Sequence, residues 1–366
     1  MLKNNIIEMK PLNTYLTEYK EYNTAGTYKP VAIGKFGIRT RESIYKKELA
    51  NDYSKNKIIF KNTLTVGMGS SQIDIGILTE DVLYSVSPAY HTYKISGAIN
   101  SDYLGYCLKQ KNYEMFNLYM KRGSRQGKSI DLVRWLTYCI PVYSIENQLY
   151  IVQILSGIEA IINKKLQILE KLDVLIKARF VEMFGDPISN PKKWLTKPFL
   201  SMGTCKNGMN FHYEDSGIEI NCLGVGDFKD LAIITDASSL PIISLNAIPS
   251  SEYLLQDGDI VFVRSNGNKK MVGRSVVVYP GIIPTTFSGF CIRYRLNDRA
   301  VDISYLLRVL KTDSVRQKMY GRGANIQNLN QQTLSSLVIP VPPLEMQKQF
   351  SNFVAQIDKS KFSKIA

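Results

Sequence analysis

An internal repeat limits the folds that this chain can adopt more than any other feature of its sequence. The Ile-Pro-Val run at 140–142 recurs at 339–341, and Gln148 recurs as Gln347. The two recurrences share one spacing, since Pro141 is as far from Pro340 as Gln148 is from Gln347. A repeat of this length is typical of two copies of one structural module, and each copy has ordinary domain size.

Each copy presents the same order of predicted elements. Short β-type runs bounded by Gly, Asn and Asp come first, as in Ile260–Val263 after the turn at 257–259. A helical segment follows, at 102–120 in the first copy and 304–319 in the second. A Gly-rich basic loop, the Ile-Pro-Val strand and a further helix complete the copy. This order predicts an α+β fold made of two mixed α/β modules.

A long helix is expected after the first module. Apolar residues recur every three or four positions from Ile151 to Met183, with Lys and Glu on the other faces. Ser144 can cap its start, and Gly185 ends it, so we predict a helix from Ile145 to Phe184. Forty residues span about 60 Å, which favours pairing with a second helix, predicted to begin at Pro343. The alternative is a helix that lies along one domain.

The charge balance narrows the class of partner. The chain has 46 Lys and Arg against 32 Asp and Glu, a formal charge of +14. Such an excess favours nucleic acid as the partner. A merely basic protein, or one half of an interface between acidic and basic subunits, would have the same balance, so charge alone leaves these alternatives open.

Motifs for catalysis or cofactor binding are missing from the sequence. Its two histidines, His91 and His212, are not in metal-binding spacings, and its five cysteines form no CxxC pair. It contains no nucleotide-binding glycine loop, and its Pro342-Pro343 pair has neither the preceding Asn or Asp nor the following aromatic residue of an adenine methyltransferase. We therefore predict a non-catalytic protein with no cofactor or metal of its own. No apolar run suits a membrane span or a secretory signal, which predicts a cytoplasmic protein.

Two segments give the chain a family resemblance. They are the Ala-Arg-Phe-Val-Glu-Met-Phe-Gly-Asp-Pro junction at 178–187, and the run from Gly321 to Leu329 that leads into Ile-Pro-Val-Pro-Pro-Leu-Glu-Met-Gln at 339–347. With two variable modules, each followed by a helix, the chain resembles the specificity subunit of type I restriction-modification enzymes.

The resemblance implies a function and partners. In that family two target-recognition domains, separated by antiparallel helices, each read half of a bipartite site in double-stranded DNA. The helices dock methyltransferase subunits, which bind S-adenosylmethionine, and restriction subunits join the complex. The competing hypothesis is an autonomous DNA-processing enzyme, such as a nuclease, with an active site that the motif search does not recognise.

The resemblance also suggests how the chain is divided. We expect a first recognition domain at 1–144, a central long helix at 145–185, a second recognition domain at 186–342, and a C-terminal helix at 343–366. The last has room for only 24 residues, so we expect it to be short or truncated.

Basic and amide side chains on predicted loops are the candidates for DNA contact, since cations bind phosphates and Arg, Lys, Asn and Gln read base edges. The candidates are Arg39, Arg41, Lys94, Arg122, Arg125, Gln126, Lys128, Arg264, Asn266, Asn268, Lys269, Lys270, Arg274 and Arg322. The strongest group is the segment 264–270, where a strand opens into a basic loop containing glycine. A solvated hairpin loop is the alternative for this segment. For the segments around Arg122 and Arg322, a structural loop or a methyltransferase contact is the alternative.

Overall fold

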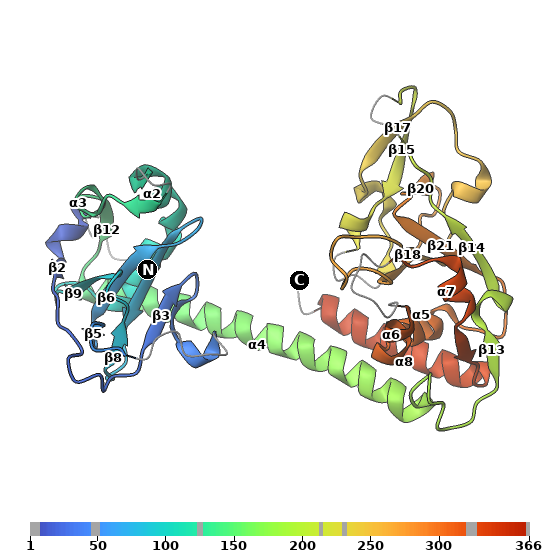
Figure 1. Cartoon of the computed structure of the whole chain (residues 1–366), viewed down its shortest axis with the longest axis horizontal. Coiled ribbons are helices and arrows are strands. Elements are labelled where there is room, and N and C mark those ends of the chain that lie inside the picture. Colours follow the sequence, from blue (N-terminus) through green and yellow to red (C-terminus); the bar gives the residue numbers. More distant parts are fainter. Residues whose placement is uncertain are drawn as a thin grey trace. The chain divides into compact units, whose positions relative to one another are not determined.

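The computed structural model describes residues 8–44, 52–122, 127–211, 215–228, 233–319 and 328–363. The chain forms two compact units, Met1–Lys165 and Leu166–Ala366, which are described separately (Figure 1). Helix and strand are mixed in both units, and the predicted α+β class is confirmed.

Unit 1 is built on a four-stranded antiparallel sheet. Its order is β2 (Leu16–Glu18), β9 (His91–Ile95), β6 (Thr63–Met68) and β7 (Ile73–Leu78). Two-stranded pairs surround it: β1 (Glu8–Pro11) with β12 (Cys139–Val142), β3 (Val31–Gly34) with β4 (Gly37–Thr40), β5 (Lys57–Ile59) with β8 (Tyr84–Val86), and β10 (Met120–Arg122) with β11 (Lys128–Ile130). The helices are α1 (Ser101–Gln110), α2 (Asn112–Tyr119) and α3 (Leu132–Trp135). Leu64, Tyr93 and Trp135 are buried in the core between sheet and helices.

Unit 2 repeats this plan with a larger sheet. Its five strands run in the order β14 (Gly203–Asn207), β21 (Cys291–Leu296), β18 (Asp259–Val263), β19 (Ser275–Val278) and β16 (Ile233–Ile234). A second sheet has the order β17 (Ile242–Leu245), β15 (Ile218–Leu223) and β20 (Thr285–Phe287), and β13 (Thr196–Pro198) pairs with β22 (Val338–Pro340). The helices are α5 (Ile303–Lys311), α6 (Asp313–Met319), α7 (Gln331–Ser335) and α8 (Leu344–Ser363).

The predicted helical segments are each divided into two helices. The first segment breaks at Lys111 between α1 and α2, and the second breaks at Thr312 between α5 and α6. In both copies an Asx residue caps the first helix, since Asn100 accepts from Tyr103 N and Asp302 accepts from Tyr305 N. The sequence periodicity did not reveal these breaks because the apolar face continues across them.

The repeated glutamines have equivalent roles in the two units. Gln148 Oε1 accepts from Asn100 N at 2.8 Å, and its Nε2 donates to Tyr143 O. Gln347 Oε1 accepts from Asp302 N at 2.8 Å, and its Nε2 donates to the carbonyls of residues 300 and 342. Both side chains are completely buried. The recurring glutamine therefore joins the start of one helix to the cap of another in each unit.

Helix α4 (Ile145–Phe184) has the bounds expected from its apolar repeat. Near its end, Phe180 and Phe184 contact Phe350 of α8 in unit 2, with ring centroids 5.5 and 5.7 Å apart. Lys361 of α8 pairs with Asp173 of α4 at 2.7 Å. The C-terminal helix thus packs against the last turns of α4, as expected, whereas earlier apolar residues such as Ile158 stay exposed.

Candidate nucleic-acid interface

The strand register identifies equivalent ends of the two main sheets. In unit 1, β6 lies between β7 and β9, and Val66 pairs with His91. In unit 2, β18 lies between β19 and β21, and Phe262 pairs with Ile292. The turn at 69–72, between β6 and β7, therefore corresponds to the loop at 264–274, between β18 and β19. Most of the described candidates lie at or near this end of their sheet.

The loop at 264–274 in unit 2, here called the basic loop, has an ordered base. Arg264 N donates to Phe290 O at 2.7 Å, and Leu329 N donates to Arg264 O at 2.9 Å. The Arg264 side chain is half-buried, and its Nη1 donates to Gly289 O at 3.3 Å. Arg264 therefore joins the loop to the turn before β21.

The tip of the basic loop is exposed and stabilised by its own asparagines. Asn266 Oδ1 accepts from Asn268 N at 2.8 Å, and Asn268 Oδ1 accepts from Lys270 N at 3.1 Å. Both carboxamide oxygens are thereby used within the loop, while the side chains of Lys269 and Lys270 reach solvent. Lys269 and Lys270 are thus presented on a hydrogen-bonded turn, a suitable arrangement for contact with phosphates.

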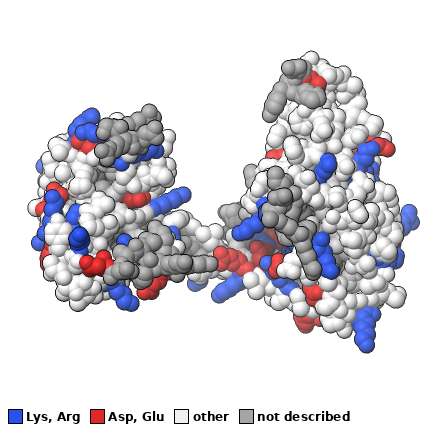
Figure 2. Space-filling model, viewed as in Figure 1, with Lys and Arg blue, Asp and Glu red and all other residues white. Residues whose placement is uncertain are grey.

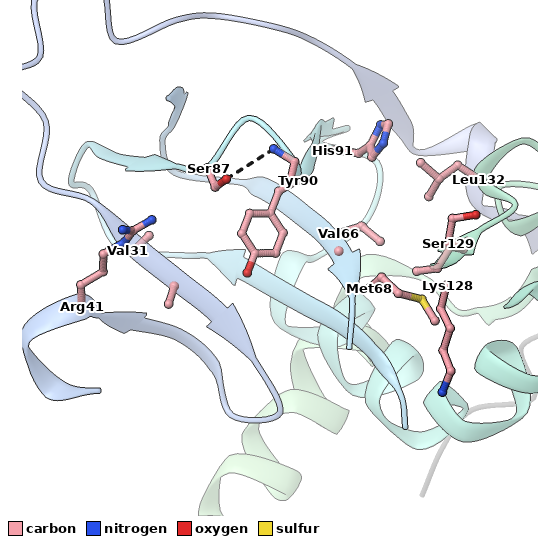
Figure 3. A pocket seen from close by; sticks show the side chains of 14 residues that line it. Val31, Arg41, Val66, Met68, Ser87, Tyr90, His91, Lys128, Ser129 and Leu132 are labelled. Atoms are coloured by element: carbon pink, nitrogen blue, oxygen red, sulfur yellow. Dashed lines mark hydrogen bonds between the residues drawn. The ribbon is translucent and has the colours of Figure 1, made fainter. Parts of the chain in front are cut away.

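A cavity lies at the equivalent end of unit 1 (Figure 3). Its volume is about 450 Å³, and it brings together Arg41, Tyr90, His91 and Lys128. In Figure 3 Tyr90 lies between Arg41 on one side and Lys128 on the other. Lys128 Nζ also donates to Ser70 O, in the turn between β6 and β7, at 3.2 Å. Two of the predicted cations therefore line one cavity, beside an aromatic ring.

The floor of this cavity depends on a glycine and a buried lysine. A Cβ at Gly67 would lie 2.3 Å from the Tyr90 ring, so only glycine lets that ring lie against β6. Tyr90 Oη donates to Ile33 O, and Lys57 Nζ donates to Tyr90 O at 2.5 Å. Lys57 is almost completely buried, and that burial lowers its pKa, as does the nearby Lys20. Lys57 was not among the predicted residues, because the sequence around this short apolar strand does not reveal which distant residue the lysine contacts.

Of the remaining described candidates, Arg39 and Lys94 are not among the residues that line the cavity of unit 1, whereas Arg274 belongs to the basic loop. Arg39 is on β4 with its guanidinium 4.7 Å from the centre of the Phe36 ring. Lys94 is exposed on β9 and lies over Tyr19 and Phe60. Arg274 is half-buried just before β19. Arg41 follows β4 and lies 5.3 Å from the ring of Tyr53.

Four candidates lie wholly or partly beyond the described structure. Arg125, Gln126 and Arg322 are outside the described residues. For Arg122 the backbone is described, at the end of β10. These residues stay predictions.

Two residues that the sequence analysis missed lie next to the basic loop. Phe290 is 61% exposed and follows Gly289, whose N–H donates to Met209 O. Arg316 of α6 donates to two carbonyls of the loop. An exposed aromatic residue beside a basic loop is suited to contact with bases, but in sequence Ser-Gly-Phe looks like an ordinary turn before a strand.

Surface charge does not by itself select this end of the sheets. On the face seen in Figure 2, Lys and Arg are scattered among Asp and Glu in both units. Within the part of the chain that the structure describes, no group of three or more His, Cys, Asp and Glu side chains is arranged to hold a metal ion. No described helix has the length and apolar composition needed to cross a bilayer.

Comparison with known proteins finds similarity to one family. The model of the type I restriction modification DNA specificity domain matches residues 196–365, which include most of unit 2. Residues 196–365 are therefore similar to this domain family. The resemblance predicted from the repeat and the two motif segments is confirmed.

Three curated proteins with similar sequences are also specificity subunits. The chain is 25% identical over 189 residues to that of the type I enzyme EcoKI from Escherichia coli strain K12 and to that of StySPI from Salmonella potsdam, covering 47% of this chain. It is 31% identical over 112 residues to the putative MjaX specificity subunit of Methanocaldococcus jannaschii, covering 30% of this chain and 26% of that protein. The match spans 38% of the length of the first two relatives.

The fold is shared with a solved S subunit. The crystal structure of the type I restriction-modification S subunit from M. genitalium aligns with 99% of this chain and 92% of its own length, with a TM-score of 0.55 and 15% identity. A structure from a study of assembly of the type I R-M system aligns with a TM-score of 0.54, 14% identity and the same coverage. Both alignments extend the likeness in fold to the first copy of the repeat.

Proposed function

We propose that this chain is a non-catalytic specificity subunit that reads a bipartite site in double-stranded DNA. In this proposal each unit reads one half-site, through the end of its main sheet that bears the basic loop in unit 2 and the Tyr90 cavity in unit 1. The main observation in support of the proposal is that these two ends are equivalent and that both present cations beside an aromatic side chain. The proposed DNA contacts are Lys128 and Arg41 in unit 1, and Lys269 and Lys270 in unit 2.

The proposal includes the partners. Methyltransferase subunits dock on α4 and α8 and supply S-adenosylmethionine and the chemistry of adenine methylation, and restriction subunits join the assembly. The match of residues 196–365 to the specificity-domain model supports this part of the proposal. Location in the cytoplasm follows from the same role.

Methylation mapping tests the proposed function. The purified chain should transfer no methyl group and cleave no DNA with any divalent metal, and it should direct methylation only with its partner methyltransferase and S-adenosylmethionine. Adenines methylated in the host genome with the gene, and unmethylated without it, should define two half-sites separated by a fixed gap. Cleavage by the isolated chain would instead support an autonomous nuclease, and a single contiguous motif would contradict reading by two units.

A further inference from the structure

Arg316 connects α6 to the basic loop, although it lies 42 positions after Arg274 at the end of that loop. Its Nη2 donates to Lys270 O and to Val272 O, each at 3.1 Å. The side chain is half-buried, and these two carbonyls belong to the part of the loop that directly follows Lys269. One guanidinium nitrogen therefore fixes two successive turns of backbone.

Helix α6 meets the loop at a second point. Gly273 has a φ of +72°, and a Cβ there would lie 3.3 Å from Met319 Cβ and Sδ. Val272, beside it, is completely buried, and Gly273 N donates to Val263 O at 2.9 Å. The C-terminal half of the loop is thus held against α6, and only its tip projects into solvent.

From this arrangement we infer that Arg316 is a positioning residue for DNA binding, which sets the place of Lys269 and Lys270 on the basic loop. The inference rests on the proposed function, since it assumes that these two lysines contact the DNA backbone. In this role Arg316 acts through the loop, because both hydrogen bonds of its Nη2 are made to loop carbonyls. Holding the lysines in place before binding reduces the conformational entropy lost when the complex forms.

A double-mutant cycle tests this role. Affinity of the full chain is measured against salt concentration with a duplex of random sequence, because phosphate contacts do not depend on base sequence. Lys269→Ala with Lys270→Ala should weaken binding and reduce the slope of log affinity against log salt by about 1.8, at about 0.9 for each lost phosphate contact. Arg316→Ala should weaken binding about fivefold, and should add nothing in the chain that already lacks both lysines.

A conservative variant separates geometry from charge. Arg316→Lys retains the positive charge but places it on a flexible stem without the fixed guanidinium plane, so it should behave like Arg316→Ala. Lys318→Ala, which removes an exposed cation from the same helix, is the matched control and should leave affinity within about twofold of the wild type. Amide hydrogen exchange in residues 268–274 should become faster in both Arg316 variants and stay unchanged in Lys318→Ala.

The outcomes distinguish the inference from the proposed function. A wild-type chain that fails to bind the duplex overturns the proposed function, and unchanged binding without both lysines overturns the loop contact and the inference with it. Three other outcomes overturn the positioning role alone. They are additive losses of affinity in the triple variant, wild-type affinity in Arg316→Ala, and wild-type affinity in Arg316→Lys. If Arg316→Ala unfolds at the temperature of the assay, the Arg316→Lys cycle decides in its place.

Discussion

Gln347 accepts a hydrogen bond from the backbone N–H of Asp302, and through this bond the start of α8 is joined to the N-cap of α5. The same side chain donates to the carbonyls of Ala300 and Pro342. Because Gln148 makes the equivalent bond to Asn100 N, the recurring glutamine is a structural feature of the module rather than a DNA contact.

Replacing Gln347 should destabilise unit 2. Gln347→Ala leaves one N–H and two carbonyls without their partner in a buried site, so we expect the free energy of unfolding to fall by about 2–4 kcal/mol. Urea unfolding measures the change. Gln349→Ala, an exposed glutamine on the same helix, is the control and should alter stability by less than about 0.5 kcal/mol. Equal effects of the two substitutions would contradict the structural role.

Gly67→Ala should displace the Tyr90 ring from the cavity of unit 1. The new Cβ would lie 2.3 Å from that ring, which has to move away, and we expect a loss of stability of about 1–3 kcal/mol. DNA affinity should fall as well, if the cavity contacts DNA. Gly97→Ala, at a position with open space around the added Cβ, is the control for both measurements. Normal DNA affinity in a folded Gly67→Ala protein would remove the cavity from the interface.

Phe290 should contribute to DNA binding by contact with a base. The ring is 61% exposed beside the basic loop, where it can pack on a thymine methyl group in the major groove, and loss of this apolar contact should cost about 1.5 kcal/mol of binding free energy. Phe290→Ala should therefore weaken binding without changing the salt slope, since no charge is lost. Phe36→Ala, at another exposed phenylalanine, is the comparison in unit 1. A reduced slope in Phe290→Ala would indicate that the loop, rather than a base contact, has been disturbed.

Lys311 should make stability depend on pH in the alkaline range. Burial, with the nearby Arg308, Arg316 and Arg274, lowers its pKa from 10.5 to about 8. Between these values the unfolded chain binds a proton that the folded chain has lost, so the free energy of unfolding should rise as pH increases from 8 to 10.5. Lys311→Met should flatten this rise and stabilise the protein at pH 7 by on the order of 1 kcal/mol. Lys318→Met is the control, and an unchanged pH profile in Lys311→Met would contradict the assignment.

The length of α4 should set the gap between half-sites. A heptad inserted between Lys165 and Leu166 adds about 10.5 Å of helix and keeps the apolar repeat in phase, whereas two residues would rotate Leu169 and Ile176 away from their positions. With the methyltransferase bound, the heptad variant should methylate the same half-sites at a gap about three base pairs longer, at about 3.4 Å for each base pair. Methylation mapping measures the gap. Retention of the original gap would show that α4 does not determine it.

The sequence by itself determined the repeat, the α+β class and the bounds of α4. These features depend on local chemistry: the apolar period from Ile151 to Met183, the glycine that ends it at 185, and the recurring motif at Gln148 and Gln347. Such patterns can be recognised without knowing which distant segments meet.

Only the tertiary structure decided how the loops are supported. Lys57 meets Tyr90, and Arg316 meets Lys270 and Val272, through pairs of residues 33 to 46 positions apart in the chain. No period or motif records such contacts, because they depend on strand order: β18 lies beside β19 and β21, and this order places the basic loop next to Phe290. The sequence could therefore identify basic loops as candidates, while the side chains that hold these loops in place became visible only in the folded chain.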